Sequence, residues 1–155
     1  PAVEKGLIEA KEKGVLAGYP VIKFKATLYD GSYHAVDSNE ISFKQAAILS
    51  FKKGISEANP VLLEPIMKFE IIIPELYLGD IMGDINKRRG RILGMDHNEY
   101  GEHVLFVEAP EVEMLKYALD LRAMTQGRGV FTFEFLRYDE VPNNLAQKII
   151  EERKS

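Results

Sequence analysis

Residues 66–93 read IMKFEIIIPELYLGDIMGDINKRRGRIL, and this stretch decides the fold. It opens with a mainly apolar stretch, Ile66–Ile73, which Pro74 closes, and this pattern predicts a β-strand. Gly90 marks the end of the helix that follows. The apolar residues of that helix recur at the spacing i, i+3, i+4, i+7: Leu78, Ile81, Met82 and Ile85. The stretch therefore predicts a strand, a helix and the start of a second strand.

Predicted strands and helices continue to follow one another up to residue 138. Two strands, Arg91–Asp96 and Val104–Ala109, flank a hairpin loop. A helix is predicted for Glu111–Thr125 and a last strand for Val130–Tyr138. The order βαββαβ is that of the ferredoxin-like fold, a four-stranded antiparallel sheet with two helices on one face.

The residues before this unit give a less complete pattern. A helix is predicted for Val3–Lys13, and Val21–Tyr29 alternates like a half-buried strand. Asp37 or Ser38 can cap a second helix. Because one strand and two helices cannot complete a sheet, we expect an incomplete α/β unit whose other strands lie upstream. A final helix is predicted for Asn143–Arg153.

The sequence thus predicts an α+β chain in three parts. Residues 1–62 form the incomplete α/β unit, residues 63–139 the ferredoxin-like domain, and residues 140–155 a C-terminal helix that we expect to pack back toward the first unit. The chain begins with Pro1 rather than Met, so either Met was removed or the chain was cut from something longer.

Composition narrows the classes of function. The 155 residues contain no cysteine, which excludes disulfides and thiolate metal sites and suits a reducing compartment, so we expect a cytoplasmic protein. No apolar run is long enough to cross a bilayer, so we expect no membrane partner. A net charge of −4 argues against nonspecific coating of nucleic acid, and any RNA contact must be local.

Basic residues gather in two places. One cluster occupies five positions and comprises Lys87, Arg88, Arg89 and Arg91, while Arg122 and Arg128 lie near a glycine-rich turn. Cations at a helix end complement the helix dipole, but four exceed that need. On the residues alone, the cluster Lys87–Arg91 either complements the helix dipole or contacts phosphates of a nucleic acid, and both interpretations stay open.

Motifs for catalysis are not found. No segment fits the P-loop pattern, so we expect no GTP hydrolysis by this chain, and we assign no catalytic residues. Imidazole and carboxylate groups could hold a metal at the predicted hairpin, but solvated loop polarity explains them better, and we assign no metal ligands there. The residues concerned are His97, Glu99, Glu102 and His103.

Three aromatic residues alternate along the last predicted strand. Phe131, Phe133 and Phe135 superficially resemble the aromatic strand of an RNA-recognition motif, but the aromatic and glycine positions of that motif do not match. Their period of two predicts instead that all three lie on the core side of the sheet.

Several stretches resemble elongation factor G in family order. Residues 28–38, LYDGSYHAVDS, are similar to the tip loop of domain IV. The other matching stretches are GVLAGYP at 14–20, PVLLEPIM at 60–67, GDIMGD at 79–84, RRGRI at 88–92, YALDLR at 117–122 and TQGRG at 125–129. The resemblance covers essentially the whole chain.

The resemblance implies a partial domain IV, a complete ferredoxin-like domain V and a C-terminal helix. His34 matches the tip histidine that approaches codon and anticodon, and Gly31, Ser32 and Tyr33 would shape its loop. Domain V would face large-subunit RNA around the GTPase-associated centre. The candidates for phosphate contact there are Arg88, Arg89, Arg91, Arg122 and Arg128, and Lys87 joins them from the basic cluster.

The family implies a ribosomal function: a ribosome-binding fragment of a factor that promotes GTP-dependent translocation of transfer RNA and messenger RNA. The implied partners are the decoding region, the tRNA–mRNA pair and the large subunit, and not DNA. GTP and magnesium would bind only in the GTPase domain, which this chain lacks, so no cofactor is expected. The alternatives are a fragment of a ribosome-recycling or ribosomal protection factor, or a stand-alone ferredoxin-like regulatory module that binds a small ligand.

Overall fold

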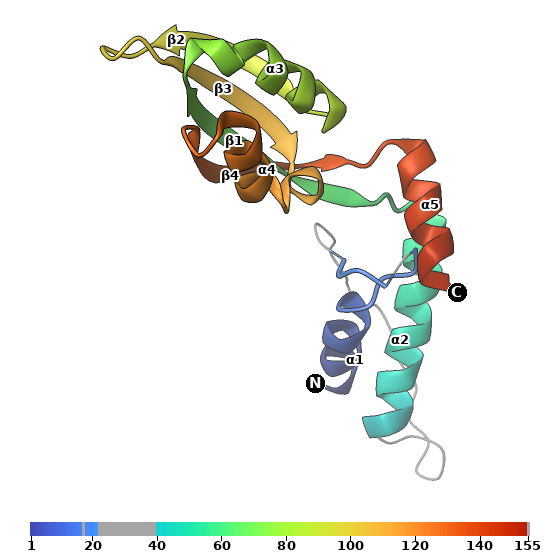
Figure 1. Ribbon diagram of the computed structural model, residues 1–155. Helices are drawn as coiled ribbons and strands as arrows, with labels where there is room; N and C mark the ends of the chain where they lie inside the picture. Colours follow the sequence, from blue (N-terminus) through green and yellow to red (C-terminus); the bar gives the residue numbers. More distant parts are fainter. Residues whose placement is uncertain (17, 22–39, 155) are drawn as a thin grey trace. The chain divides into compact units, whose positions relative to one another are not determined.

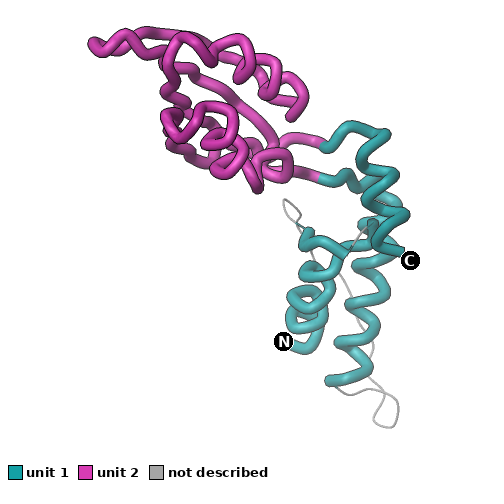
Figure 2. Tube along the Cα trace, in the orientation of Figure 1, with its two compact units in different colours: residues 1–62, 141–155 teal, residues 63–140 magenta. Residues whose placement is uncertain are grey.

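The computed structural model describes residues 1–16, 18–21 and 40–154. It divides the chain into two compact units (Figures 1 and 2). Unit 1 comprises Pro1–Leu62 and Val141–Ser155, and unit 2 comprises Leu63–Glu140. The chain passes between the units twice, and the two crossings are hydrogen-bonded: the Val141 N–H donates to the Leu62 carbonyl at 2.9 Å.

Unit 2 is built on a four-stranded antiparallel sheet. Its strands are β1 (Leu63–Ile73), β2 (Arg91–His97), β3 (His103–Pro110) and β4 (Val130–Glu140), in the spatial order β2-β3-β1-β4. Helices α3 (Leu78–Lys87) and α4 (Tyr117–Thr125) complete the order βαββαβ (Figure 1). The α+β, ferredoxin-like prediction for this part of the chain is confirmed.

Strand alternation places the core of unit 2 between the helices and one face of the sheet. Every second side chain of β1 and β3 is buried there, as period two requires. Both helices contribute to the same cluster. Its fully buried members include Ile71, Ile73, Ile81, Ile85, Leu105, Val107, Tyr117 and Leu121.

The predicted helix over residues 111–125 is in fact two elements. Glu111–Met114 is a 3₁₀ turn, and α4 begins only at Tyr117, because Lys116 has non-helical dihedrals of φ −107° and ψ 12°. Met114 and Tyr117 are both buried in the core. The two side chains thus reach the core from different elements, Met114 from the 3₁₀ turn and Tyr117 from the first residue of α4.

The last strand corrects one prediction. Phe131 packs against the core, but Phe133 and Phe135 are 62% and 52% exposed. All three lie on the helix-covered face, since Phe133 pairs with Phe69 and Phe135 with Met67. However, β4 is an edge strand, and the helices pack over the central strands. The predicted face is thus right, and the predicted burial of two of the rings is wrong.

Unit 1 contains the helices α1 (Ala2–Lys11), α2 (Glu40–Glu57) and α5 (Asn143–Lys154). α5 lies in this unit with the Arg153 guanidinium 4.1 Å from the centre of the Tyr19 ring. The predicted strand at residues 21–29 falls almost wholly outside the described residues. Within the described part of the chain, no helix has the length and apolar character needed to cross a membrane.

A close helix–helix contact holds α1 against α2. Gly6 is buried, and a Cβ atom built there would lie 2.5 Å from the Lys44 carbonyl oxygen and 2.9 Å from the Ala47 Cβ. Only a residue without a side chain fits such an approach between two backbones. Ala10 and Phe51 extend the buried contact on either helix.

Gly6→Ala should lower the free energy of unfolding by about 1–3 kcal/mol, because the added methyl group forces the helices apart. Gly54→Ala is the matched control, since no atom lies within 4 Å of a Cβ added at this α2 position. It should raise stability by about 0.5–1 kcal/mol through helix propensity alone. Urea unfolding followed by far-UV circular dichroism measures both changes. Equal effects of the two substitutions would show that the contact at Gly6 is not close.

Candidate functional site

Arg88 joins the two helices of unit 2. Its Nε donates to Asp84 Oδ2 at 2.8 Å, its Nη1 donates to the Glu113 carbonyl at 2.8 Å, and its Nη2 donates to Asp120 Oδ2. The guanidinium also lies 5.1 Å from the centre of the Tyr117 ring, and the side chain is only 15% exposed. The end of α3 is thereby tied to the beginning of α4.

Arg89 makes the second internal ion pair. Its backbone is left-handed, with φ 57°, which costs a non-glycine residue about 1–2 kcal/mol. From this position its two Nη groups donate to both carboxylate oxygens of Glu64 at 2.8 and 2.9 Å. Its Nε donates to Glu113 at 3.2 Å. A bidentate pair with a carboxylate that is nearly buried offsets the backbone strain.

The helix ends at this pair of arginines in a compact turn. The Gly90 N–H donates to the Ile85 carbonyl at 2.9 Å, a bond typical of a helix C-terminus with a left-handed residue before it. A Cβ at Gly90 would lie 2.6 Å from Ile85 Cγ2, so this predicted stop residue is also required sterically.

These contacts give Arg88 and Arg89 a structural role. From the sequence alone both are predicted to bind phosphate, but each guanidinium now holds carboxylates of its own chain. Binding a phosphate would require giving up those partners. Of the carboxylates that pair with Arg88 and Arg89, only Asp84 can be predicted from the sequence, because it lies four residues before Arg88 on the same helix. The others come from distant positions, namely Glu64, Glu113 and Asp120.

Tyr117 lies under this network. Burial raises the pKa of its phenol well above the usual range, and the nearby Asp84 carboxylate adds to the rise while Arg88 opposes it. Its hydroxyl has no hydrogen-bond partner among the described residues. The phenol therefore stays neutral, and it serves as a packing surface for the Arg88 guanidinium.

Arg91 belongs to a different surface, the sheet face away from the helices. There Glu108 accepts hydrogen bonds from both Nη groups of Arg137 at 3.1 and 3.2 Å, and Arg91 Nη2 lies 3.3 Å from the same carboxylate. Hydrogen bonding from Arg137 lowers the pKa of Glu108. The Arg91 side chain remains 75% exposed, so it can still reach a further partner.

Three predicted cations are exposed and form no ion pair within the described part of the chain: Lys87, Arg122 and Arg128. Arg122 and Arg128 are close in the chain fold, because the Gly127 N–H donates to the Arg122 carbonyl at 2.8 Å. Gly127 has φ 81°, which fits the predicted tight turn.

The cations do not form one patch. Arg91 faces away from the helices, whereas Arg122 and Arg128 lie at the end of α4. Lys87 lines an open groove of about 390 Å³ along α3, together with Gly79, Asp80, Gly83, Asp84 and Met124. The cations are therefore distributed over separate points of unit 2.

The polar residues of the predicted hairpin lie at the end of β2, in the turn and at the start of β3. The expected solvation is wrong for His103, which is only 6% exposed. His97 pairs with His103 across the strands, and Asn98 closes the turn by accepting the N–H groups of Tyr100 and Glu102. In the part of the chain that the structure describes, no group of three or more His, Cys, Asp or Glu is placed to hold a metal. The predicted tip residues Gly31, Ser32, Tyr33 and His34 lie outside the described residues.

Comparison with known families accounts for nearly all of the chain. The model for elongation factor G domain IV matches residues 1–59, and the model for the elongation factor G C-terminus matches residues 61–149.

The chain belongs to the elongation factor G family.

A crystal structure of a protein from Thermus thermophilus is also similar to it, with 50% sequence identity and a TM-score of 0.84. The match covers 99% of this chain and 23% of that one. The chain thus spans about a quarter of the length of that protein, and it carries the domain IV and C-terminal parts of a translation elongation factor.

In this elongation factor G C-terminal unit, Arg88→Ala should lower the free energy of unfolding by about 2–3 kcal/mol, since two carboxylates lose their partner, one of them largely screened from water. Arg122→Ala removes the same charge from an exposed helix position and should change stability by less than about 0.5 kcal/mol. Thermal unfolding of the two variants measures the loss of stability in each. A small effect of Arg88→Ala would mean that the network is not formed in solution.

Glu108 makes stability depend on acid pH. Because its pKa in the folded state lies below the usual 4.5, its ion pair stabilises fully above that pH and is lost as the pH falls through the lower folded value. Glu108→Gln cannot titrate, so its stability should fall less steeply below pH 4.5 than that of the wild type. Urea unfolding over this pH range tests the slope. Glu70→Gln, at an exposed position of β1, removes a carboxylate outside this ion pair, and an equal change of slope in both variants would contradict the role of the Glu108 ion pair.

Proposed function

We propose that this chain is the ribosome-contacting part of a factor that promotes GTP-dependent translocation of transfer RNA and messenger RNA. The observation that carries the proposal is the family match, which runs from domain IV through the C-terminus without a gap of more than one residue. GTP binding and hydrolysis, with magnesium, are assigned to a part of the factor outside this chain. The factor acts in the cytoplasm, where ribosomes are its partner.

We assign a different ribosomal contact to each of the two matched domains. The domain IV part would enter the decoding region, with His34 near codon and anticodon and Gly31, Ser32 and Tyr33 shaping its loop. This assignment rests on the resemblance of residues 28–38 to the family tip loop. The ferredoxin-like unit would meet RNA of the large subunit around the GTPase-associated centre.

The ion pairs of unit 2 support a choice among the cations for the second contact. A phosphate is attracted most by a cation that has no carboxylate partner, since a paired cation must first give up its partner. Lys87, Arg122 and Arg128 meet this condition within the described residues, and Arg91 is mostly exposed. Arg88 and Arg89 do not meet it. We therefore assign the RNA contacts of unit 2 to these four residues: Lys87, Arg91, Arg122 and Arg128.

The salt dependence of binding tests this assignment. If each of the four cations neutralises one phosphate, the slope of log K against log salt should be about −3, at roughly 0.7 to 0.9 per contact. The double variant Arg122→Ala, Arg128→Ala should halve the slope to about −1.5. The measurement is a titration of the labelled chain with large ribosomal subunits at several salt concentrations.

A charge-matched control comes from unit 1. Lys52→Ala with Lys53→Ala removes two exposed cations of α2 and should leave the slope for large subunits unchanged. The same reduction in both double variants would indicate an effect of net charge rather than local contact. Binding that does not respond to salt would contradict the proposed phosphate contacts.

A further inference from the structure

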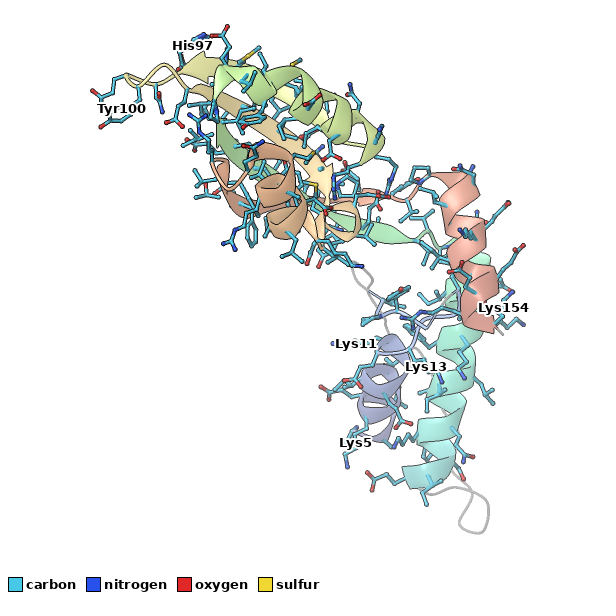
Figure 3. The ribbon with its side chains drawn as sticks, in the orientation of Figure 1. Lys5, Lys11, Lys13, His97, Tyr100 and Lys154 are labelled. Atoms are coloured by element: carbon cyan, nitrogen blue, oxygen red, sulfur yellow. The ribbon has the colours of Figure 1, made fainter. Side chains whose placement is uncertain are left out.

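Two of the three histidines of the chain meet where the β2–β3 hairpin begins. His97 and His103 are register partners in the antiparallel ladder, so their side chains lie on the same face of the sheet. The ring centres are 4.3 Å apart and the rings are inclined at 69°. Figure 3 shows His97 at the hairpin end of unit 2, with Tyr100 beyond it in the turn.

The inner histidine has a nitrogen that the protein leaves without a partner. His103 is 6% exposed, and its Nδ1 has no hydrogen-bond partner among the described residues. A buried polar atom without a partner costs about 1–3 kcal/mol. His97 is exposed, so an ion from solvent can reach the pair from its side. This nitrogen has almost no accessible surface, so an ion must enter between the two rings to reach it.

The hairpin turn holds both strands in place beside the pair. Asn98 Oδ1 accepts the N–H groups of Tyr100 and Glu102, each at 3.0 Å, and the Asn98 side-chain amide donates to Glu102 Oε1 at 3.1 Å. The Asn98 backbone N–H donates to the Glu102 carbonyl at 3.0 Å. These bonds fix the separation of the two histidine backbones before any ligand arrives.

We propose that His97 and His103 bind one divalent transition-metal ion, such as Zn²⁺ or Ni²⁺, through one imidazole nitrogen each. Imidazole is a ligand that both ions favour. With metal–nitrogen bonds of about 2.1 Å, two imidazoles at neighbouring positions of one ion have centres roughly 4.5–5 Å apart. The rings at 4.3 Å need to open by about 0.2–0.7 Å.

Water completes the coordination shell on the exposed His97 side. No third His, Cys, Asp or Glu of the described chain is grouped with the pair, so the protein supplies two ligands only. Such a site binds more weakly than a structural zinc site with four protein ligands, and its ion exchanges with solvent. The ion needs His97 of β2 and His103 of β3 close together, so it binds the folded hairpin and not the separated strands. Binding therefore raises the free energy of unfolding of unit 2.

The test is a titration of the full 155-residue chain with Ni²⁺ and Zn²⁺, followed by calorimetry and by the NMR signals of the imidazole C–H groups. One ion should bind per chain, and the signals of His97 and His103 should shift together. His97→Ala should weaken binding by at least about tenfold, because it removes one of the two ligands. The melting temperature should rise with added metal in the wild type and not in this variant.

Two further variants separate the pair from other ligands. His103→Gln keeps most of the buried volume while removing the imidazole, and it should weaken binding as strongly as His97→Ala. His34→Ala removes the third histidine and should bind the metal like the wild type. The proposal is overturned if the wild type binds no ion, if His97→Ala binds equally well, or if His34→Ala alone abolishes binding.

Discussion

Burial of a single sheet face under two short helices is the constraint on which unit 2 depends. The inward side chains of β1 and β3 and those of α3 and α4 form one cluster, with Ile71 and Leu105 among its fully buried members. Because the helices are short, their ends lie at the rim of this cluster, where charged groups must be satisfied without bulk water. Arg88, stacked on Tyr117 and bonded to two carboxylates, meets that requirement at the rim between the helices.

The elements that can be predicted are those set by local pattern. The apolar stretch at residues 66–73 predicts a strand, and the helical spacing from Leu78 to Ile85 predicts a helix with one buried face. The order of such elements indicates the ferredoxin-like sheet. The edge position of β4 is not local, because it depends on which strands pair. The spacing of Phe133 and Phe135 therefore predicts the correct face, but it does not predict their exposure.

The candidate site is harder to predict for the same reason. A run of basic residues shows where charge is located in the sequence, but not which carboxylates meet it after folding. Glu64 precedes Arg89 by 25 residues and lies at the beginning of β1. The left-handed backbone at Arg89 directs the Arg89 side chain toward Glu64. The sequence shows Lys87 and Arg88 as equivalent neighbours, and the structure separates them into an exposed cation and an internal ion pair.

The paired crossings at Leu62 and Val141 make unit 1 discontinuous in sequence, with all of unit 2 inserted within it. This has a consequence for the order of events during synthesis. Unit 2 is complete once residue 140 has left the exit tunnel and can fold as an uninterrupted segment. Unit 1 has to wait for α5, so its early helices remain without their C-terminal portion while the whole inserted domain is being made. A nascent chain that stalls just after β4 would present a finished ferredoxin-like domain attached to an unfinished one.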